Sequence, residues 1–367
     1  MERKIRIGMI GCGQIAQHHM RTYKEIPEAE MVACCDINEA AARASSETFG
    51  IPDVYTDFHE MLRREDIDAV DVCLHNNYHM PATVAALQAG KHVYCEKPMA
   101  GAYVDAKRML DTARETGKHL HIQLSTLYAN ETKAAKELID LGEVGRIYHA
   151  RSTGFRRRGR PYVDGYGTPS FVQKAHASGG ALYDMGVYHI AQVLYLMGNP
   201  NAERISGKTY QETDMDEERR RISNYDVEEI GMGFVRFAGG ATLDIIEAWA
   251  ANLDGFEGSS LFGSKAGIRL SPFGFFKNIG NIELNATANL GAAAFRWDNV
   301  RGDGPFYRNS QAHWIAALLG KCPLIPTAEI ALNTMLVSEG IYLSDKLGRE
   351  VTADEVQQHS VSTSVPI

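Results

Sequence analysis

The chain has 367 residues, 44% of them hydrophobic, and a formal net charge of -8. This length is more than one domain usually holds, so we expect two domains. The negative charge argues against a nucleic-acid backbone or an anionic membrane as a partner. The sequence contains no run of about 18 or more apolar residues and no signal-peptide pattern at its start, which predicts a soluble cytoplasmic protein.

The cysteines give no sign of a disulfide framework or a metal site. Most of the six lie inside apolar, strand-like runs, and the sequence has neither a CxxC pair nor a Cys/His pairing at zinc spacing. We therefore expect reduced thiols in the core and no bound metal.

The chain opens with a strand, a glycine turn and a helix. The β-branched run KIRIGMI leads into GCGQIA at residues 11–16, and helical spacing follows. In this G-x-G-x-x-A pattern Gly11 permits a tight turn and Gly13 lets a pyrophosphate approach the backbone, while the helix N-terminus offers free N–H groups. The residues expected to contact a dinucleotide here are Gly11, Gly13, Gln14 and Ile15.

A second strand, within residues 29–38, ends in Asp36. This carboxylate follows the glycine turn at about the 20-residue spacing of the acidic group that binds the ribose hydroxyls of a dinucleotide. It would repel a 2′-phosphate, and no Arg or Ser stands nearby to bind one. The pattern therefore predicts NAD rather than NADP. The alternative is an ordinary tight turn followed by a surface aspartate.

Strands and helices continue to alternate after Asp36. Alternation of this kind predicts an α/β fold with a parallel, doubly wound Rossmann sheet, whose ligands bind at the carboxyl ends of the strands. We assign this NAD-binding domain to residues 1–124. The expected strands are 68–74, 91–96 and 119–125, and the expected helices between them are 81–90 and 102–117.

The stretch YCEKPMA, residues 94–100, places Lys97 at the carboxyl end of one of these strands. A cation at that edge stabilises a developing alkoxide. Further along the chain, GGALYDMG carries a G-G-x-x-x-D-x-G motif that contains Asp184. Together with the glycine turn, these motifs resemble the Gfo/Idh/MocA family of oxidoreductases, the relatives of glucose-fructose oxidoreductase and inositol dehydrogenase. The resemblance covers essentially the whole chain, including its closing stretch GIYLSDKLGREV.

This resemblance implies a fold and an activity. It implies a second α/β domain with an open, mainly antiparallel sheet, which we assign to residues 125–367, and a homodimer or homotetramer formed through that sheet. The implied activity is NAD-dependent hydride transfer between nicotinamide and a secondary alcohol of a sugar, glycoside or polyol. Lys97 would bind the reacting hydroxyl, and Asp184 would bind a substrate hydroxyl and support the lysine. Glu96 and Pro98 would position Lys97, and Glu96 and Lys97 would also contact the cofactor.

The helix that follows Asp184 offers two candidates for the proton carrier. On an α-helix Tyr188 shares a face with Asp184, whereas His189 is rotated a further ~100°. Family members carry His or Tyr at the position of Tyr188, which favours Tyr188. A tyrosine with its ordinary pKa of about 10 needs a lower value, induced by Lys97 or NAD, to act as a base near neutral pH. His189 needs no such shift and stays the alternative.

The segment HNNYH, residues 75–79, matches the family pattern in part. By resemblance Asn76 is expected to contact the dinucleotide, and His79 to lie at the cofactor side or to buttress the start of a helix. His75 departs from the pattern, and we expect it either to contact substrate or to be structural.

A Gly/Pro-rich, aromatic and basic segment, residues 155–178, precedes the Asp184 helix. Such a loop suits a sugar site, because tyrosine faces stack on a pyranose while Arg and Asp side chains bind its hydroxyls. The loop candidates for substrate binding are Tyr162, Asp164 and Tyr166. The arginines at 156, 157, 158 and 160 are alternatively an anion or subunit contact, and an exposed loop without a role is the remaining alternative.

Two other functions stay open. The first is an enzyme that retains its NAD and cleaves a glycoside by transient oxidation and elimination, with no net redox change. The second is a non-catalytic, cofactor-sensing protein, against which the intact E-K-P motif and Asp184 argue. Net formation of NADH separates the dehydrogenase from the glycoside-cleaving enzyme.

Overall fold

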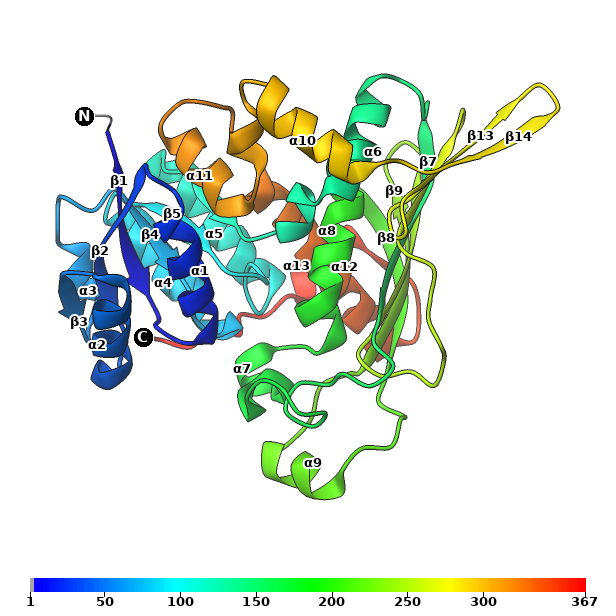
Figure 1. Cartoon of the computed structure of the whole chain (residues 1–367). Coiled ribbons are helices and arrows are strands. Elements are labelled where there is room, and N and C mark those ends of the chain that lie inside the picture. Colours follow the sequence, from blue (N-terminus) through cyan, green and yellow to red (C-terminus); the bar gives the residue numbers. More distant parts are fainter. Residues whose placement is uncertain (1–2) are drawn as a thin grey trace.

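The computed structural model describes residues 3–367, in which two β-sheets are surrounded and separated by helices (Figure 1). The first sheet is parallel, with strand order β3-β2-β1-β4-β5-β6. The direction of winding reverses between β1 and β4, and ligands of such sheets bind beside this switch point. The expected Rossmann sheet is confirmed. Its strands are β1 (Ile5–Ile10), β2 (Ala29–Cys35), β3 (Asp53–Tyr55), β4 (Ala69–Val72), β5 (His92–Cys95) and β6 (Leu120–Ile122).

Local signals explain where the helices of this sheet begin and end. The Asn38 side chain accepts the N–H groups of Ala40 and Ala41 at the start of α2, and Gly50, with a φ of 68°, ends that helix. The helices that connect these strands are α1 (Gln14–Lys24), α2 (Glu39–Phe49), α3 (Phe58–Leu62), α4 (Asn76–Gln88) and α5 (Tyr103–Thr116).

Helix α4 begins at Asn76, earlier than the predicted start at residue 81, so Pro81 lies inside the helix. A proline lacks the N–H that would bond to the carbonyl four residues before it, here that of Asn77. The backbone N–H of Val365, near the C-terminus, donates to that carbonyl at 3.0 Å. The C-terminal tail thus replaces the missing donor and lets the helix extend through the proline.

The second sheet has strand order β14-β13-β12-β11-β7-β10-β9-β8-β15. Neighbouring strands are antiparallel except β7 and β10, which are parallel. The expected open, mainly antiparallel sheet is confirmed, and its β13–β14 hairpin projects beyond the body of the molecule (Figure 1). The strands are β7 (Ile147–Phe155), β8 (Ala202–Tyr210), β9 (Ile230–Phe237), β10 (Thr242–Ala248), β11 (Ser260–Gly263), β12 (Gly267–Arg269), β13 (Gly274–Ile279), β14 (Ile282–Ala286) and β15 (Val351–Thr352).

Two C-terminal helices connect the sheets. Helix α12 (Thr327–Leu347) packs on β8 and β9 of the second sheet and on α5 and β6 of the first. Helix α11 (Ser310–Leu318) returns to the first sheet, where Trp314 joins the core around Ile7 and Tyr94. The boundary that we propose at residue 124 therefore separates two sheets whose helices interlock. The remaining helices are α6 (Asn130–Asp140), α7 (Lys174–Ala177), α8 (Val187–Leu196), α9 (Glu217–Ser223), α10 (Leu290–Val300) and α13 (Ala353–His359).

Two properties of the whole chain bear on the expectations from the sequence. Across residues 3–367, no helix combines the length and the apolar character needed to cross a membrane. All six cysteines are free thiols, and five of them are buried.

Candidate active site

The glycine turn between β1 and α1 has an open side. Gly11 has a φ of 93°, and a Cβ there would lie 2.3 Å from the carbonyl oxygen of Cys73, so only glycine fits. A Cβ at Gly13 would meet nothing within 4 Å. Helix α1 starts at Gln14 without a side-chain cap, and Gln14 and Ile15 are exposed. The free N–H groups beside an open glycine fit the pyrophosphate of a dinucleotide.

Asp36 lies at the end of β2, next to this turn. Its Oδ2 accepts the backbone N–H of Cys12 at 2.9 Å, and its Oδ1 accepts that of Asn38 at 2.8 Å. Both carboxylate oxygens are thereby held in place, and each keeps a lone pair for a ribose hydroxyl. The position fits the ribose contact expected from the sequence.

Glu96 does not face the cofactor side. Its carboxylate is buried, accepts the backbone N–H of Lys97 at 2.9 Å, and pairs with Nε2 of His19 at 2.9 Å. The other ring nitrogen of His19 lies 2.9 Å from Asp71. Burial would raise the pKa of Glu96, but the His19 contact outweighs it and the pKa is lowered. The expectation of a dinucleotide contact at Glu96 is corrected: the side chain fixes the backbone of the lysine turn instead.

His19 is a buried cation between two carboxylates. Burial alone would lower its pKa, but the negative charge of Asp71 and contact with Cys73 raise it well above the ordinary value. His19, Asp71 and Cys73 have the ligand types of a metal site, with ligand atoms within 4.8 Å of one another. Since both ring nitrogens of His19 already have carboxylate partners, the cluster is better described as an ion network that joins α1, β4 and β5 under the lysine turn.

Two of the three candidates from the HNNYH segment, His79 and Asn76, have structural partners. His79 is buried, with Nδ1 2.8 Å from the carbonyl oxygen of Pro98 and Nε2 3.0 Å from that of Leu74. It therefore buttresses the lysine turn and has no free nitrogen for a cofactor. Asn76 donates from Nδ2 to the carbonyl of Ala177 at 2.8 Å and so links α4 to the loop before the Asp184 helix.

His75 lies at the N-terminus of α4 and faces residues of the second domain. Its ring contacts the edge of Phe171, with centroids 5.9 Å apart, and its centroid lies 6.5 Å from that of His176. The side chain is exposed, so it remains free to meet a ligand.

Lys97 and Asp184 form the ion pair at the centre of the site. The lysine Nζ lies 2.9 Å from Asp184 Oδ1 and also donates to the Asp184 carbonyl at 2.8 Å. Asp184 Oδ2 accepts the indole N–H of Trp249 at 3.0 Å and lies 3.5 Å from Nη1 of Arg156. Burial would raise the pKa of Asp184, but Lys97 outweighs this and the pKa is lowered. At neutral pH both groups are therefore charged.

The backbone that carries Asp184 is not a regular α-helix. Leu182–Gly186 form a π-helical turn, and α8 follows from Val187. A π turn adds one residue to the helix, which rotates the following side chains by about 100° relative to a continuous α-helix. The α-helical spacing that favours Tyr188 over His189 therefore does not hold here.

A buried glutamate holds the start of this helix. The Glu228 carboxylate accepts the N–H groups of Gly180 and Leu182 at 2.8 and 3.0 Å, and the hydroxyl of Tyr342 at 2.8 Å. A Cβ at Gly180 would lie only 1.9 Å from the Glu228 carbonyl oxygen, which explains the second glycine of the GG pair. Despite these donors, burial raises the pKa of the Glu228 carboxyl.

Tyr188 lies against the lysine. The Lys97 Nζ is 4.7 Å from the centroid of the Tyr188 ring. Burial raises the pKa of Tyr188 to about 12, although Lys97 opposes this shift. Lys97 alone therefore does not lower the pKa of Tyr188, because desolvation of the phenolate outweighs the nearby cation.

His189 has the partner of a general base. Its Nδ1 lies 2.9 Å from Oε2 of Glu247, a buried carboxylate whose Oε1 accepts the hydroxyl of Ser152 at 2.9 Å. Burial would lower the pKa of His189, but Glu247 outweighs it and the pKa is raised. The side chain is 27% exposed, and Nε2 has no protein partner among residues 3–367. A carboxylate-held imidazole with a free Nε2 can take and return a proton.

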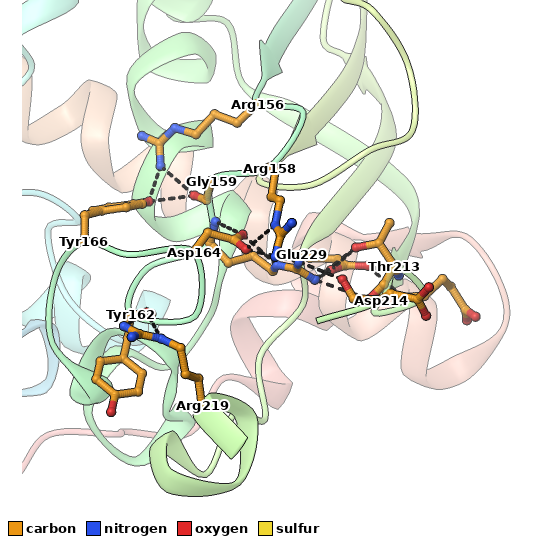
Figure 2. A network of polar contacts seen from close by, with 12 residues as sticks. Arg156, Arg158, Gly159, Tyr162, Asp164, Tyr166, Thr213, Asp214, Arg219 and Glu229 are labelled. Carbon is orange, nitrogen blue, oxygen red and sulfur yellow. Dashed lines mark hydrogen bonds and ion pairs between the residues drawn. The ribbon is translucent and has the colours of Figure 1, made fainter. Parts of the chain in front are cut away.

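The loop after β7 is fixed by buried ion pairs (Figure 2). Arg160 is 1% exposed and contacts Asp164 Oδ2 at 2.9 Å and Glu229 Oε2 at 3.0 Å. Asp164 also pairs with Arg158 at 3.0 Å. The carboxylate of Asp164 is thus committed to two arginines, so it is not available to bind a sugar and the expected substrate contact is corrected.

The two loop tyrosines point in different directions (Figure 2). The Tyr162 ring packs against the guanidinium of Arg219, 4.6 Å from the centroid, and its carbonyl accepts from Arg219 Nε at 2.9 Å. Tyr162 is therefore tied to α9. Tyr166 instead donates its hydroxyl to the Gly159 carbonyl at 2.8 Å and accepts from Arg156, the arginine that reaches Asp184. Tyr166 stays a candidate substrate contact.

Two groups that complete this site lie outside the motifs that the sequence singled out. Glu247 and Trp249 come from the end of β10 and the residue after it, and contact His189 and Asp184. Neither residue lies in the glycine turn, the E-K-P stretch or the Asp184 motif.

Comparison with known protein families finds a match in each of the two domains. Residues 5–124 match the profile of the oxidoreductase family with an NAD-binding Rossmann fold, and residues 132–269 match the GFO/IDH/MocA C-terminal domain. The chain belongs to the Gfo/Idh/MocA family. The Gfo/Idh/MocA resemblance seen in the sequence is thereby confirmed, and so is NAD as the cofactor.

Among relatives in this family, D-glucoside 3-dehydrogenase of Escherichia coli (strain K12) is 29% identical over 355 residues, 95% of this chain and 97% of that protein. Myo-inositol 2-dehydrogenase of Thermotoga maritima is 29% identical over 265 residues, 72% of this chain and 74% of that protein. The structure of levoglucosan dehydrogenase in complex with NADH and L-sorbose matches with a TM-score of 0.80 at 20% identity, over 96% of this chain and 99% of that chain. The last comparison shows that this chain shares the fold of that structure over 96% of its length.

Proposed function

We propose that this chain is an NAD-dependent dehydrogenase that transfers hydride between nicotinamide and a secondary alcohol of a sugar, glycoside or polyol. The observation that carries the proposal is the ion pair of Lys97 and Asp184, at 2.9 Å, together with a histidine that follows Asp184 on the same helical segment and is held by a buried carboxylate. The names of the relatives, a glucoside 3-dehydrogenase and an inositol 2-dehydrogenase, support the substrate class.

Each residue of the site has a defined task in this reaction. Bound NAD supplies the hydride acceptor for alcohol oxidation. Lys97 donates a hydrogen bond to the reacting oxygen and stabilises the alkoxide as charge develops. Asp184 accepts from a neighbouring substrate hydroxyl and keeps Lys97 in place. His189 accepts the hydroxyl proton at Nε2, and Glu247 stabilises the imidazolium that results. Tyr188 keeps its proton and lines the site beside Lys97.

Cofactor contacts are assigned to the first sheet. We place the pyrophosphate at Gly11, Gly13 and the start of α1, at Gln14 and Ile15, and the ribose at Asp36. This assignment rests on the open side of Gly13 and on the fixed carboxylate of Asp36.

Substrate contacts are assigned to Tyr166, Arg156 and His75. The Tyr166 ring is exposed, so it can stack on the apolar face of a sugar, and Arg156 lies next to its hydroxyl. His75 is proposed as a further contact, because its exposed ring lies beside Phe171 of the loop that also carries Tyr166.

We also propose that the protein is a homodimer or homotetramer formed through the outer face of the second sheet. That face carries exposed apolar side chains, among them Met232, Phe234 and Phe262. Contiguous apolar side chains on a sheet are a frequent site of subunit contact. Light scattering after size-exclusion chromatography measures the mass directly, and a mass of 40.5 kDa, that of one chain, would contradict this proposal.

The glycoside-cleaving alternative is not favoured, since the relatives named above are dehydrogenases.

Exchange of Lys97 for methionine tests the dehydrogenase site. We expect Lys97→Met to lose about 10²- to 10⁴-fold in kcat while NADH fluorescence still reports cofactor binding. Lys107→Met removes a surface lysine paired with Asp111 and serves as the control. Wild-type turnover by the Lys97→Met protein would refute the proposed role of the lysine.

A further inference from the structure

Arg156 follows β7 directly and brings a guanidinium to the catalytic ion pair. Its side chain extends from the end of β7 toward Tyr166, as Figure 2 shows. A Cβ at Gly159 would lie 2.7 Å from Cδ of Arg156, so the glycine makes room for the arginine stem. The Arg156 backbone N–H donates to the carbonyl of Ala248 on β10 at 2.8 Å. The arginine is therefore built into the site and not a freely moving surface residue.

One nitrogen makes all the polar side-chain contacts of Arg156. Nη1 donates to the Gly159 carbonyl at 3.2 Å and to the Tyr166 hydroxyl, and it lies 3.5 Å from Asp184 Oδ2. Within residues 3–367, Nε and Nη2 have no hydrogen-bond or ion-pair partner, and the side chain is 38% exposed. The free Nε/Nη2 edge is the planar two-donor fork that matches a carboxylate with two parallel hydrogen bonds.

Unlike Arg158 and Arg160, Arg156 shares its neighbouring carboxylate with a lysine. Arg158 and Arg160, in the same loop, are matched by Asp164 and Glu229. The carboxylate next to Arg156 is that of Asp184, which is already paired with Lys97. Glu247 is the partner of His189 and leaves Arg156 unpaired. Arg156 therefore has no carboxylate that it alone contacts among the described residues.

We propose that the substrate carries a carboxylate, as in a sugar acid, a uronic acid or a glycoside of a uronic acid, and that Arg156 binds it through Nε and Nη2. This rests on the proposed dehydrogenase function and narrows its substrate class. A carboxylate has two coplanar oxygens that match the two parallel donors of the free edge, and its negative charge pairs with the guanidinium.

The test compares matched substrates and matched variants. The wild-type protein is assayed with NAD⁺ and a panel of uronates, aldonates and methyl glycosiduronates, each beside its neutral counterpart. We expect kcat/KM to favour the acids about 10- to 100-fold, and Arg156→Gln to remove this preference. Arg156→Lys keeps the charge but loses the fork, so its preference should fall in between. Arg157→Gln changes the same charge at an exposed arginine without a side-chain partner in the described chain, and should retain the preference.

A wild-type preference for neutral substrates would overturn the inference, as would equal losses in Arg156→Gln and Arg157→Gln. Thermal unfolding of each variant shows whether it is folded. If neither the acids nor their neutral counterparts are oxidised although NADH binds, the proposed dehydrogenase function fails. Calorimetric titration of the acids into the NADH-bound protein then tests the carboxylate site separately. Binding that Arg156→Gln abolishes would support the site, and no binding of any acid to the wild type would refute it.

Discussion

The pairing of His189 with Glu247 gives the sharpest prediction about the chemistry. Glu247→Gln keeps the shape of a buried side chain but removes its charge 2.9 Å from Nδ1 of His189. In the wild type Glu247 raises the pKa of His189 against the effect of burial. Without that charge only burial and the nearby Arg156 act, and both lower the pKa. The pKa of His189 therefore falls in Glu247→Gln.

The size of the effect follows from the contact. An opposite charge at hydrogen-bond distance shifts a pKa by about 1–3 units, and each unit corresponds to about 1.4 kcal/mol. The imidazolium that forms when His189 takes the proton is less stable by that amount. Alcohol oxidation above the pKa should therefore slow by about 10- to 10³-fold. Since the base must be unprotonated, the acidic limb of the kcat/KM profile should move to lower pH by about 1–3 units.

The assay is the pH dependence of NAD⁺ reduction for the wild type, Glu247→Gln and two comparison variants. Ser152→Ala removes a hydroxyl from the other oxygen of Glu247 but leaves the charge, so its acidic limb should stay close to that of the wild type. Tyr188→Phe should keep most of its activity, because a tyrosine with a pKa of about 12 keeps its proton near neutral pH. If Tyr188→Phe abolishes turnover while the acidic limb of Glu247→Gln stays in place, Tyr188 is the proton carrier and the assignment of His189 is wrong.

Three further changes test other parts of the structure. Asp36→Asn removes the charge at the ribose position, so the preference for NADH over NADPH should fall about tenfold or more in titrations followed by the fluorescence of each cofactor. An unchanged ratio of the two dissociation constants would argue against a ribose contact at Asp36. Arg160→Met leaves Glu229 buried without its cation, and urea unfolding should show a loss of about 3–5 kcal/mol, whereas a loss below about 1 kcal/mol would contradict the ion network. Gly101→Ala places a Cβ 2.0 Å from Oδ1 of Asn77, which should lower the free energy of unfolding by about 1–3 kcal/mol in the same measurement. Wild-type stability of this variant would show that the Asn77 side chain can move to make room.

The features that the sequence predicts well are local ones. The glycine turn at Gly11 and Gly13, the end of β2 at Asp36 and the strand end at Lys97 each depend on neighbouring residues, and the structure has them as predicted. Alternating strands and helices define the parallel sheet for the same reason.

The features that the sequence does not predict depend on contacts between distant segments. Arg160 pairs with Asp164 within one loop, but Glu229, which holds Arg160, comes from a distant segment. The carbonyl that Pro81 leaves without a helical donor is bonded by the distant Val365. No local pattern connects Glu229 or Val365 to these residues.

Helix spacing alone does not identify the proton carrier. An α-helical wheel places Tyr188 on the face of Asp184, and the π turn at Leu182–Gly186 changes that relation. The wheel also contains no information about Glu247, which lies on β10 and raises the pKa of His189. Tertiary contacts, not helix spacing, therefore favour His189.

The most direct test of the proposed function is a single assay. Purified protein is mixed with NAD⁺ and a panel of sugars, sugar acids, inositols and glycosides, and NADH absorbance and products are followed together. A dehydrogenase forms NADH in step with a keto product from one substrate class, and this is the result that we expect. Release of an aglycone with no net NADH would contradict it and would make the redox step internal to a glycoside-cleaving reaction.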